Sequence, residues 1–472
     1  MNARTAGTVA AGFGSADITP WEGVQLAGAA MGEARPARFV RRPLYAKAAV
    51  FRGKKTVCMI GLDVICVTTH YSGMIRDRIA EKYEIDREAI MVFAIQSHSA
   101  PSVGEVMLDQ DFPIELPPEL KFITGSNEAY AEFAVEGALR AADDAFSSVR
   151  PLKMDVKSGT KHGLAFCRRL VMRNGVVEMW PLNSAKANPL GPDILYPESP
   201  ADDEVGVVCF KDEKMKMAGA LLHFTAHPVC DFCTPSLYHA VSPDWCGVWS
   251  ERLQEKLGFG TIPMVMNGSC GNINPYDPYA PDFVMDSVKV GSQLADLAER
   301  IILSMEFAGA DAPLEVDFRS FEVPIDYRNV PEERVREVEE ILADGKVHLD
   351  ENGNAGQEWF EAASTCSALC EAKREGRFMY PVQIFKIGSL ALVSMAGEPF
   401  TDGQLQIKLH SKAAYTYVTH MANKYIGYIP AKKAYVSGGY ETHEKYTYWT
   451  KVAPGSLEKI CDRIIEELNS FF

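Results

Sequence analysis

Residues 45–95 read YAKAAVFRGKKTVCMIGLDVICVTTHYSGMIRDRIAEKYEIDREAIMVFAI. Residues 45–51 and 56–67 are apolar runs separated by a polar turn, which is typical of two neighbouring buried strands. Apolar residues then recur at helical spacing over 70–85, and residues 89–95 return to a short apolar run. Strands and a helix that alternate in this way predict an α/β fold.

The same alternation continues along most of the chain and predicts a mixed β-sheet core flanked by helices. We find no internal repeat, low-complexity tract or clear interdomain linker, so we expect residues 1–472 to form a single domain. The expected helices are residues 127–146, 249–258, 284–305, 331–345 and 456–468, and the expected strands are residues 205–212, 217–226, 261–267, 314–323, 380–396 and 414–420.

A proline-rich segment departs from this alternation. Residues 180–204 read WPLNSAKANPLGPDILYPESPADDE. Loops of this length are usually functional or disordered. We expect a long surface excursion that could serve as a lid.

Composition excludes several classes of partner. The 472 residues carry a net charge of −15, which disfavours nucleic acid and anionic membrane surfaces. We find no run of about 18 apolar residues, so we expect no integral membrane segment. The N-terminal residues lack a secretory apolar stretch, and the eleven cysteines are an odd number. We therefore expect a cytoplasmic protein with reduced thiols.

Four segments share one design, an apolar strand that ends in polar residues and turn formers. They are VFAIQSHSAP (92–101), LLHFTAHPVC (221–230), VMNGSCGNINP (265–275) and LVSMAGEPF (392–400). Loops after strand ends are the usual place for a site in α/β folds. We expect the polar side chains that follow these strands to converge, namely His98, His227, Asn272, Asn274 and Glu398.

Imidazole and carboxylate groups at such strand ends suit a zinc ion, which often takes both ligand types in catalytic sites. The alternative is structural, because a single histidine at a strand end is commonly a hydrogen-bonded residue without a catalytic role. The four similar strand ends favour the functional interpretation.

Several segments, in order, resemble signature segments of the neutral ceramidase family of zinc-dependent amidases. These are AGFGSADITPWEGVQLAG, RRPLYAKAAVF, SHSAP, FTAHPV, GNINP, GEPF and GYIPAKKAYVSGGYE. The resemblance spans nearly the whole chain. It implies a hydrolase in which zinc, held by two histidines, a glutamate and a tyrosine, activates water to attack an N-acyl bond.

The resemblance also implies roles for individual residues. The second histidine ligand falls on His227, the glutamate on Glu398 and the tyrosine on Tyr435. The first ligand is a histidine in the family, but this chain has Gln96 there. The site histidine that faces the reacting group falls on His98.

The resemblance extends to residues that would contact the substrate. The segment CRRLVMRNG is similar to the family's arginine-bearing segment, which implies that Arg168 or Arg169 binds a substrate oxygen anion. We assign Asn274, which would orient the substrate, to the catalytic residues together with His98, and we assign Asn272 and Tyr440 to substrate binding.

Three of these positions depart from the family pattern. Gln96 replaces a histidine, Asn272 an aspartate and Asn274 a serine. A neutral amide oxygen is a poorer zinc ligand than imidazole, so metal affinity should fall. Either a weaker or different metal is kept through Gln96, His227, Glu398 and Tyr435, or the site has become metal-free and reuses its remaining groups as acid, base or substrate contacts.

We therefore expect a metal-dependent hydrolase of an N-acyl bond in a small acylated substrate, with zinc as the cofactor. The alternative is a metal-free protein of the same fold with a binding or regulatory role. A third alternative is a redox dithiol or half zinc site at Cys230 and Cys233. We expect no C-terminal immunoglobulin-like domain of the kind that secreted ceramidases carry, and the sequence leaves homo-oligomer formation open.

Overall fold

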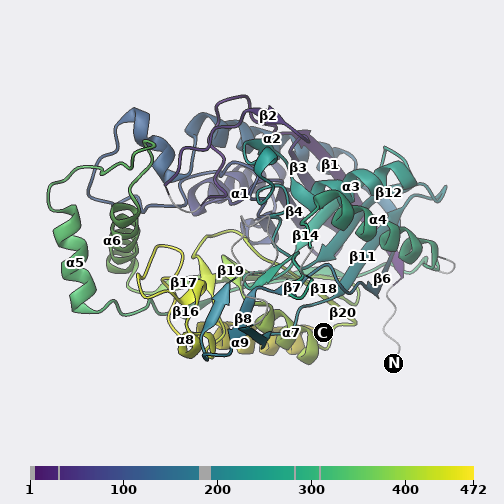
Figure 1. Ribbon diagram of the computed structural model, residues 1–472. Coiled ribbons are helices and arrows are strands. Elements are labelled where there is room, and N and C mark those ends of the chain that lie inside the picture. Colours follow the sequence, from purple (N-terminus) through teal and green to yellow (C-terminus); the bar gives the residue numbers. More distant parts are fainter. Residues whose placement is uncertain (1–5, 30–31, 180–192, 281–282, 308–309) are drawn as a thin grey trace.

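The larger of two stacked sheets organises the fold. The computed structural model describes residues 6–29, 32–179, 193–280, 283–307 and 310–472 (Figure 1). This sheet has eight strands in the order β14-β12-β11-β6-β1-β3-β4-β5. They are β1 (Gly7–Asp17), β3 (Tyr45–Arg52), β4 (Thr56–Leu62), β5 (Ile90–Ala94), β6 (Arg150–Thr160), β11 (Glu204–Lys211), β12 (Met217–Phe224) and β14 (Ile262–Asn267). Most neighbouring strands are antiparallel, but β4 and β5 run parallel, as do β12 and β14. The predicted mixed sheet is confirmed.

The smaller sheet has four strands in the order β16-β17-β18-β20 and packs face to face against the larger one. It consists of β16 (Val316–Ile325), β17 (Phe378–Ile387), β18 (Leu390–Ser394) and β20 (Tyr415–Thr419). Alternation along each strand creates the two faces of the larger sheet. In β3, Phe51 packs between the sheets, whereas its neighbour Val50 packs under the helices.

Helices cover the outer faces of both sheets, giving four layers (Figure 1). The larger sheet is covered by α1 (Thr69–Tyr83), α2 (Glu128–Ser147), α3 (Asp244–Leu257) and α4 (Ser287–Leu303), the smaller by α7 (Thr401–His410) and α9 (Ser456–Phe471). The helices α5 (Glu332–Leu342) and α6 (Gln357–Glu375) lie together at one end of the molecule. No helix in the described ranges is both long and apolar enough to cross a membrane.

Short strands, one short helix and several 3₁₀ turns lie in the connections between the longer elements. They are β2 (Phe39–Val40), β7 (Phe166–Cys167), β8 (Arg169–Met172), β9 (Val177–Met179), β10 (Ile194–Pro197), β13 (Ala240–Val241), β15 (Ile273–Asn274), β19 (Glu398–Pro399), β21 (Tyr428–Ile429) and α8 (Ala434–Ser437). The 3₁₀ turns are η1 (Arg87–Ala89), η2 (Pro118–Thr124), η4 (Pro235–Leu237) and η5 (Tyr440–Thr442).

The apolar run 56–67 was expected to be one strand, but β4 ends at Leu62. The following residues, Val64 to Val67, are buried in the core under the helices, so they are apolar without belonging to the sheet. Of the proline-rich segment 180–204, residues 180–192 lie outside the described residues, and residues 194–197 form β10 beside β8.

Candidate functional site

A cavity of about 280 Å³ lies where loops that follow strands of both sheets meet. Six of its lining residues are aromatic, among them Tyr440, which the sequence analysis assigned to substrate binding, and four polar lining residues were also singled out there. The aromatic residues are Phe232, Tyr238, Tyr425, Tyr428, Tyr440 and Trp449. The four polar residues are Gln96, His98, Arg168 and Glu398. An apolar cavity with a few convergent polar groups is the usual form of a small-molecule site.

His98 presents an unused nitrogen to this cavity. Its Nδ1 lies 2.9 Å from the carbonyl oxygen of Gly28, which can only accept a hydrogen bond, so Nδ1 carries the proton. Its Nε2 is buried and has no hydrogen-bond partner among the described residues. Burial, followed by the neighbouring His227, lowers the pKa of His98 to about 3. At neutral pH the ring is therefore uncharged, and Nε2 is a free acceptor.

His227 follows β12 and precedes a proline, as the sequence suggested. Its Nδ1 donates to the carbonyl oxygen of Ile273 over 3.0 Å, which leaves Nε2 as an acceptor. This Nε2 lies 3.5 Å from Oε2 of Glu398 and 3.5 Å from Nη1 of Arg168. Burial first, and then Arg168, lower the pKa of His227 to about 3, so it too is neutral at pH 7.

Glu398 stands at the start of β19, where it pairs in parallel register with Tyr428 of β21. The hydroxyl of Tyr425 donates to its Oε1 over 3.0 Å. Its Oε2 is buried and has no hydrogen-bond partner in the described part of the chain. Glu398 thus has one oxygen held in place and one free.

Arg168 brings a positive charge to the same cavity. Its Nε donates to Oε1 of Glu441 over 2.8 Å, and Glu441 also accepts from Nη1 of Arg169 over 2.7 Å. Burial disfavours the charge of Glu441, yet Arg168 and Arg169 hold its pKa below its ordinary value. The guanidinium carbon of Arg168 lies 5.3 Å from the ring centre of Tyr428, and its Nη2 has no partner among the described residues.

Gln96 lies on the cavity wall with a backbone φ of 69°, a left-handed conformation that is uncommon for residues other than glycine. Its side-chain amide lies 2.8 Å from Nε2 of His420 and 3.4 Å from Sγ of Cys270. His420 directly follows β20 and is fully buried. Gln96 is thus held by a third imidazole.

Three further residues from the sequence analysis do not line the cavity. Asn272 accepts from the backbone N–H of Thr401 over 2.9 Å, and its amide donates to Asp402, so it holds the start of α7. Asn274 is buried in β15, and its Oδ1 has no hydrogen-bond partner among the described residues. The hydroxyl of Tyr435 donates to the carbonyl oxygen of Val452 over 2.5 Å.

The predicted ligand set does not fit a zinc ion in this arrangement. Of the four residues, only His227 and Glu398 face each other, while Gln96 contacts His420 and Tyr435 bonds elsewhere. Across the described residues, no group of three or more His, Cys, Asp or Glu side chains could hold a metal ion.

Sequence reasoning missed several residues around the cavity. Tyr425, Tyr428 and Glu441 belong to or adjoin the quoted segment GYIPAKKAYVSGGYE, but only the fold shows which of its tyrosines reach the cavity. His420 is the last residue of the predicted strand 414–420, so the strand-end pattern that selected His98 and His227 could also have selected it.

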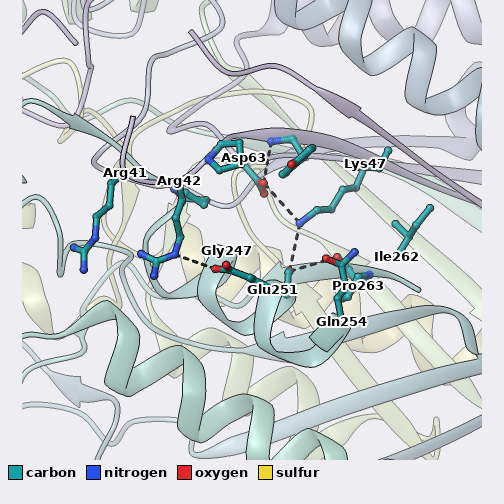
Figure 2. A pocket seen from close by; sticks show the side chains of 14 residues that line it. Arg41, Arg42, Lys47, Asp63, Gly247, Glu251, Gln254, Ile262 and Pro263 are labelled. Carbon is teal, nitrogen blue, oxygen red and sulfur yellow. Dashed lines mark hydrogen bonds and ion pairs between the residues drawn. The ribbon is translucent and has the colours of Figure 1, made fainter. Parts of the chain in front are cut away.

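Two other features fit a site less well. A cavity of about 430 Å³ lies between β3 and α3, and Figure 2 shows its charged lining. There Lys47 faces Asp63 at 3.6 Å, Arg42 faces Glu251 at 3.1 Å and Arg41 faces Asp231 at 2.5 Å, so each of these cations already has a carboxylate. Cys230 and Cys233 are free thiols whose pKa burial raises, which disfavours the reactive thiolate.

Comparison with solved structures identifies proteins of the same architecture. A structure described as a ceramidase complexed with C2 superposes with a TM-score of 0.69 at 18% identity, covering 98% of this chain and 75% of the other. The neutral ceramidase from Pseudomonas aeruginosa gives a TM-score of 0.67 at 18% identity, covering 99% of this chain and 75% of the other. Protein-family models and curated protein sequences give no match. The resemblance noted in the sequence is confirmed at the level of the fold, and the chain has the neutral ceramidase fold.

Proposed function

We propose that the chain is a hydrolase that cleaves the N-acyl bond of a small amide. The observation that carries this proposal is that three buried polar atoms on residues lining the cavity have no hydrogen-bond partner in the described part of the chain, namely His98 Nε2, Arg168 Nη2 and Glu398 Oε2. An unsatisfied buried polar group costs about 1–3 kcal/mol, and more when charged. A ligand that hydrogen-bonds to all three would recover that free energy. The shared ceramidase fold supports amide hydrolysis as the reaction class.

The three groups suit the needs of amide hydrolysis. Oε2 of Glu398, which has no hydrogen-bond donor bound among the described residues, can take a proton from water as the water oxygen attacks the carbonyl carbon of the amide. Nε2 of His227, 3.5 Å away, can then accept a hydrogen bond from the protonated carboxyl. The same carboxyl then gives this proton to the amide nitrogen as the C–N bond breaks, so that the products are a carboxylic acid and an amine.

Arg168 is suited to stabilise the oxyanion. Its Nη2 has no hydrogen-bond partner within the described ranges, and the buried Glu441 pairs with its positive charge. Such a preorganised donor aimed at developing negative charge is typically the largest contribution to catalysis of acyl transfer. Nε2 of His98 can accept a hydrogen bond from the attacking water or from a substrate hydroxyl.

The size of the cavity supports a small acyl group. Pockets for drug-sized ligands span about 300–1,000 Å³, and this cavity of about 280 Å³ lies at the lower edge of that range. The aromatic wall favours an apolar acyl chain. We propose short-chain N-acyl compounds as substrates.

Metal dependence, which the family resemblance implies, is the expectation that the donor geometry supports least. The proton transfers and oxyanion stabilisation proposed above use only side chains of this chain. Elemental analysis of protein purified without added metal addresses this point directly. A stoichiometric transition metal would show that the donor set rearranges around an ion.

The proposal is tested with a panel of p-nitroanilides bearing acyl chains of two to eight carbons. We expect hydrolysis of the shorter members, and a loss of about 10²- to 10⁴-fold in kcat/KM for Glu398→Gln, because the general base is removed. The matched control is Glu322→Gln, which alters a half-exposed carboxylate beside Lys424 that does not line the cavity. Binding of acyl compounds without turnover would instead favour the binding-protein alternative.

A further inference from the structure

The cavity of about 430 Å³ between β3 and α3 has the size of a small-molecule site, since such pockets span about 300–1,000 Å³. It shares no lining residue with the candidate active site. Its cations have carboxylate neighbours, which makes it a poor place for proton transfer. The contacts nevertheless leave two of these cations with hydrogen-bond donors to spare.

Lys47 is the first of the two. It is the only charged residue in the apolar run 45–51, and its side chain is only 9% exposed. A lysine is almost never buried to this extent unless it is paired. Figure 2 shows it reaching from the strand toward Asp63 and α3.

The contacts of Lys47 are long for a buried ammonium. Its Nζ lies 3.3 Å from Oγ of Ser250 and 3.6 Å from Oδ2 of Asp63. Charged N–H···O hydrogen bonds are usually about 2.7–2.9 Å. Oδ2 of Asp63 also accepts from the backbone N–H of Tyr45 over 3.0 Å. An ammonium has three N–H donors, so Lys47 keeps donor capacity for a further acceptor.

Arg42 is the second cation. Its Nε donates to Oε2 of Glu251 over 3.1 Å, but its Nη1 is buried and has no hydrogen-bond partner within the described ranges. Leaving a buried donor of a charged group unsatisfied is costly. The side chain of Glu251 is 51% exposed, so this ion pair is of the solvent-screened kind that contributes little.

The two cations are held at the same turn of one helix. Lys47 contacts Ser250 and Arg42 contacts Glu251, and these are consecutive residues of α3. The hydroxyl of Ser250 donates to the carbonyl oxygen of Pro263 over 3.4 Å, which leaves its lone pairs for Lys47. An acceptor group bound in the cavity can therefore meet both cations.

The rest of the lining indicates the class of ligand. Asp63 and Glu251 line the same cavity and would repel a dianion such as phosphate. A carboxylate carries a single negative charge and two acceptor oxygens. The apolar part of the wall suits a short aliphatic body and consists of Pro43, Pro243, Ile262 and Pro263.

We propose that the cavity between β3 and α3 is a binding site for a small organic carboxylate, whose oxygens accept hydrogen bonds from Nζ of Lys47 and Nη1 of Arg42. The aliphatic part of the ligand lies against Ile262 and the prolines. This site does not depend on the proposed hydrolysis. A carboxylic acid is, however, one product of that reaction, so the test has to distinguish the two cavities.

Two isoleucines provide a local probe for each cavity. Ile262 lines the cavity between β3 and α3, whereas Ile65 lines the candidate active site. In protein with ¹³C-labelled isoleucine methyl groups, Ile262→Val and Ile65→Val assign the two signals. We expect hexanoate to shift the Ile262 signal saturably, with a Kd of about 1 mM or lower. Hexylammonium, which has the same aliphatic chain and the opposite charge, and inorganic phosphate should leave the signal in place.

Arg42→Gln tests the unpartnered donor. It should weaken the hexanoate response of Ile262 about tenfold, the equivalent of one charged hydrogen bond, and leave the Ile65 response unchanged. Arg252→Gln is the matched control, because it removes the same charge from an arginine of α3 that pairs with Glu255 at the surface and does not line the cavity. Its Ile262 response should equal that of the wild-type protein. If Arg42→Gln does not fold, the three probes on the wild-type protein still decide the matter.

The outcomes separate this site from the proposed function. A saturable Ile262 response in a protein that hydrolyses no amide would support the site while contradicting the hydrolase. Three results would overturn the site: a hexanoate response at Ile65 alone, an equal response of Ile262 to hexylammonium or phosphate, or an unchanged affinity in Arg42→Gln.

Discussion

Replacing Glu441 with glutamine tests the buried charge network that holds Arg168. The side chains of Glu441 and Arg169 are fully buried, and that of Arg168 is 3% exposed. Glu441→Gln keeps the shape but leaves a single acceptor oxygen and an NH₂ group between two guanidinium groups. One of the two arginines must then lose its partner.

The magnitude follows from the two hydrogen bonds of 2.8 and 2.7 Å. Hydrogen bonds to charged groups contribute about 1.5–3 kcal/mol each, and breaking a buried ion pair typically costs about 3–5 kcal/mol. Arg169 keeps Glu198 as a second carboxylate, which limits the loss. We expect the free energy of unfolding to fall by about 4 kcal/mol at pH 7.

The effect should depend on pH in a defined direction. The pKa of Glu441 is lower in the folded protein than its ordinary value of 4.5. The stabilisation is therefore present above pH 4.5 and is lost as the pH falls through the folded-state pKa. The difference between wild type and Glu441→Gln should narrow in that acidic range.

The assay is urea unfolding followed by tryptophan fluorescence at pH 7 and at pH 4 and below. Glu322→Gln is the control, because its 3.6 Å contact with Lys424 is half exposed and should contribute less than about 1 kcal/mol. A Glu441→Gln protein within about 1 kcal/mol of wild type at pH 7 would refute the view that this network stabilises the fold.

Three further perturbations test other parts of the structure. Lys47→Met leaves the buried Asp63 without its cation and should lower the unfolding free energy by about 3 kcal/mol in the same urea assay; an unchanged midpoint would contradict a structural role for the pair. Gly28→Ala would place a Cβ 2.0 Å from the carbonyl oxygen of His98, so we expect kcat/KM to fall about 100-fold with little change in circular dichroism, and full activity would argue against His98 as a site residue. The pKa values of His98 and His227 are about 3 in the folded protein, compared with an ordinary imidazole value of 6.5. The free energy of unfolding should therefore decline as the pH falls below 6.5, because these two residues then take up protons only in the unfolded chain. The pH profile of activity should show no limb between pH 6 and 7. An inflection near 6.5 in kcat/KM would contradict neutral, buried imidazoles.

The sequence predicted the alternating elements well but not their division into two sheets. Periodicity identified the residues of β3, β12 and β14, yet nothing in a single apolar run indicates which partner strand it will join. The strand β1 was missed altogether, although it lies near the centre of the larger sheet. Its residues are mostly small, because α2 lies directly on it: a Cβ on Gly14 would stand 2.0 Å from the carbonyl oxygen of Ala141.

The sequence predicted which loops after strand ends form the candidate site, but it did not predict the contacts between their side chains. The loops that hold His98 and Glu398 were selected from their position after apolar runs, and both residues line the cavity. The sequence pattern did not show which of the nearby tyrosines reaches the cavity, because that depends on local backbone geometry. Tyr428 pairs with Glu398 through β21, whereas Tyr435 sits on the short helix α8 and bonds to a backbone carbonyl.

The cavity is built from loops of both sheets, which gives any ligand a mechanical effect. Gln96 and His98 follow the larger sheet, whereas Glu398 and Met421 follow strands of the smaller one. A molecule bound between these residues would contact loops of both sheets. At a free concentration of 100 times its Kd, it would add about 2.7 kcal/mol to the free energy of unfolding. Heat resistance can therefore reveal a substrate before any chemistry is detected, through a rise in melting temperature across a library of acyl amides.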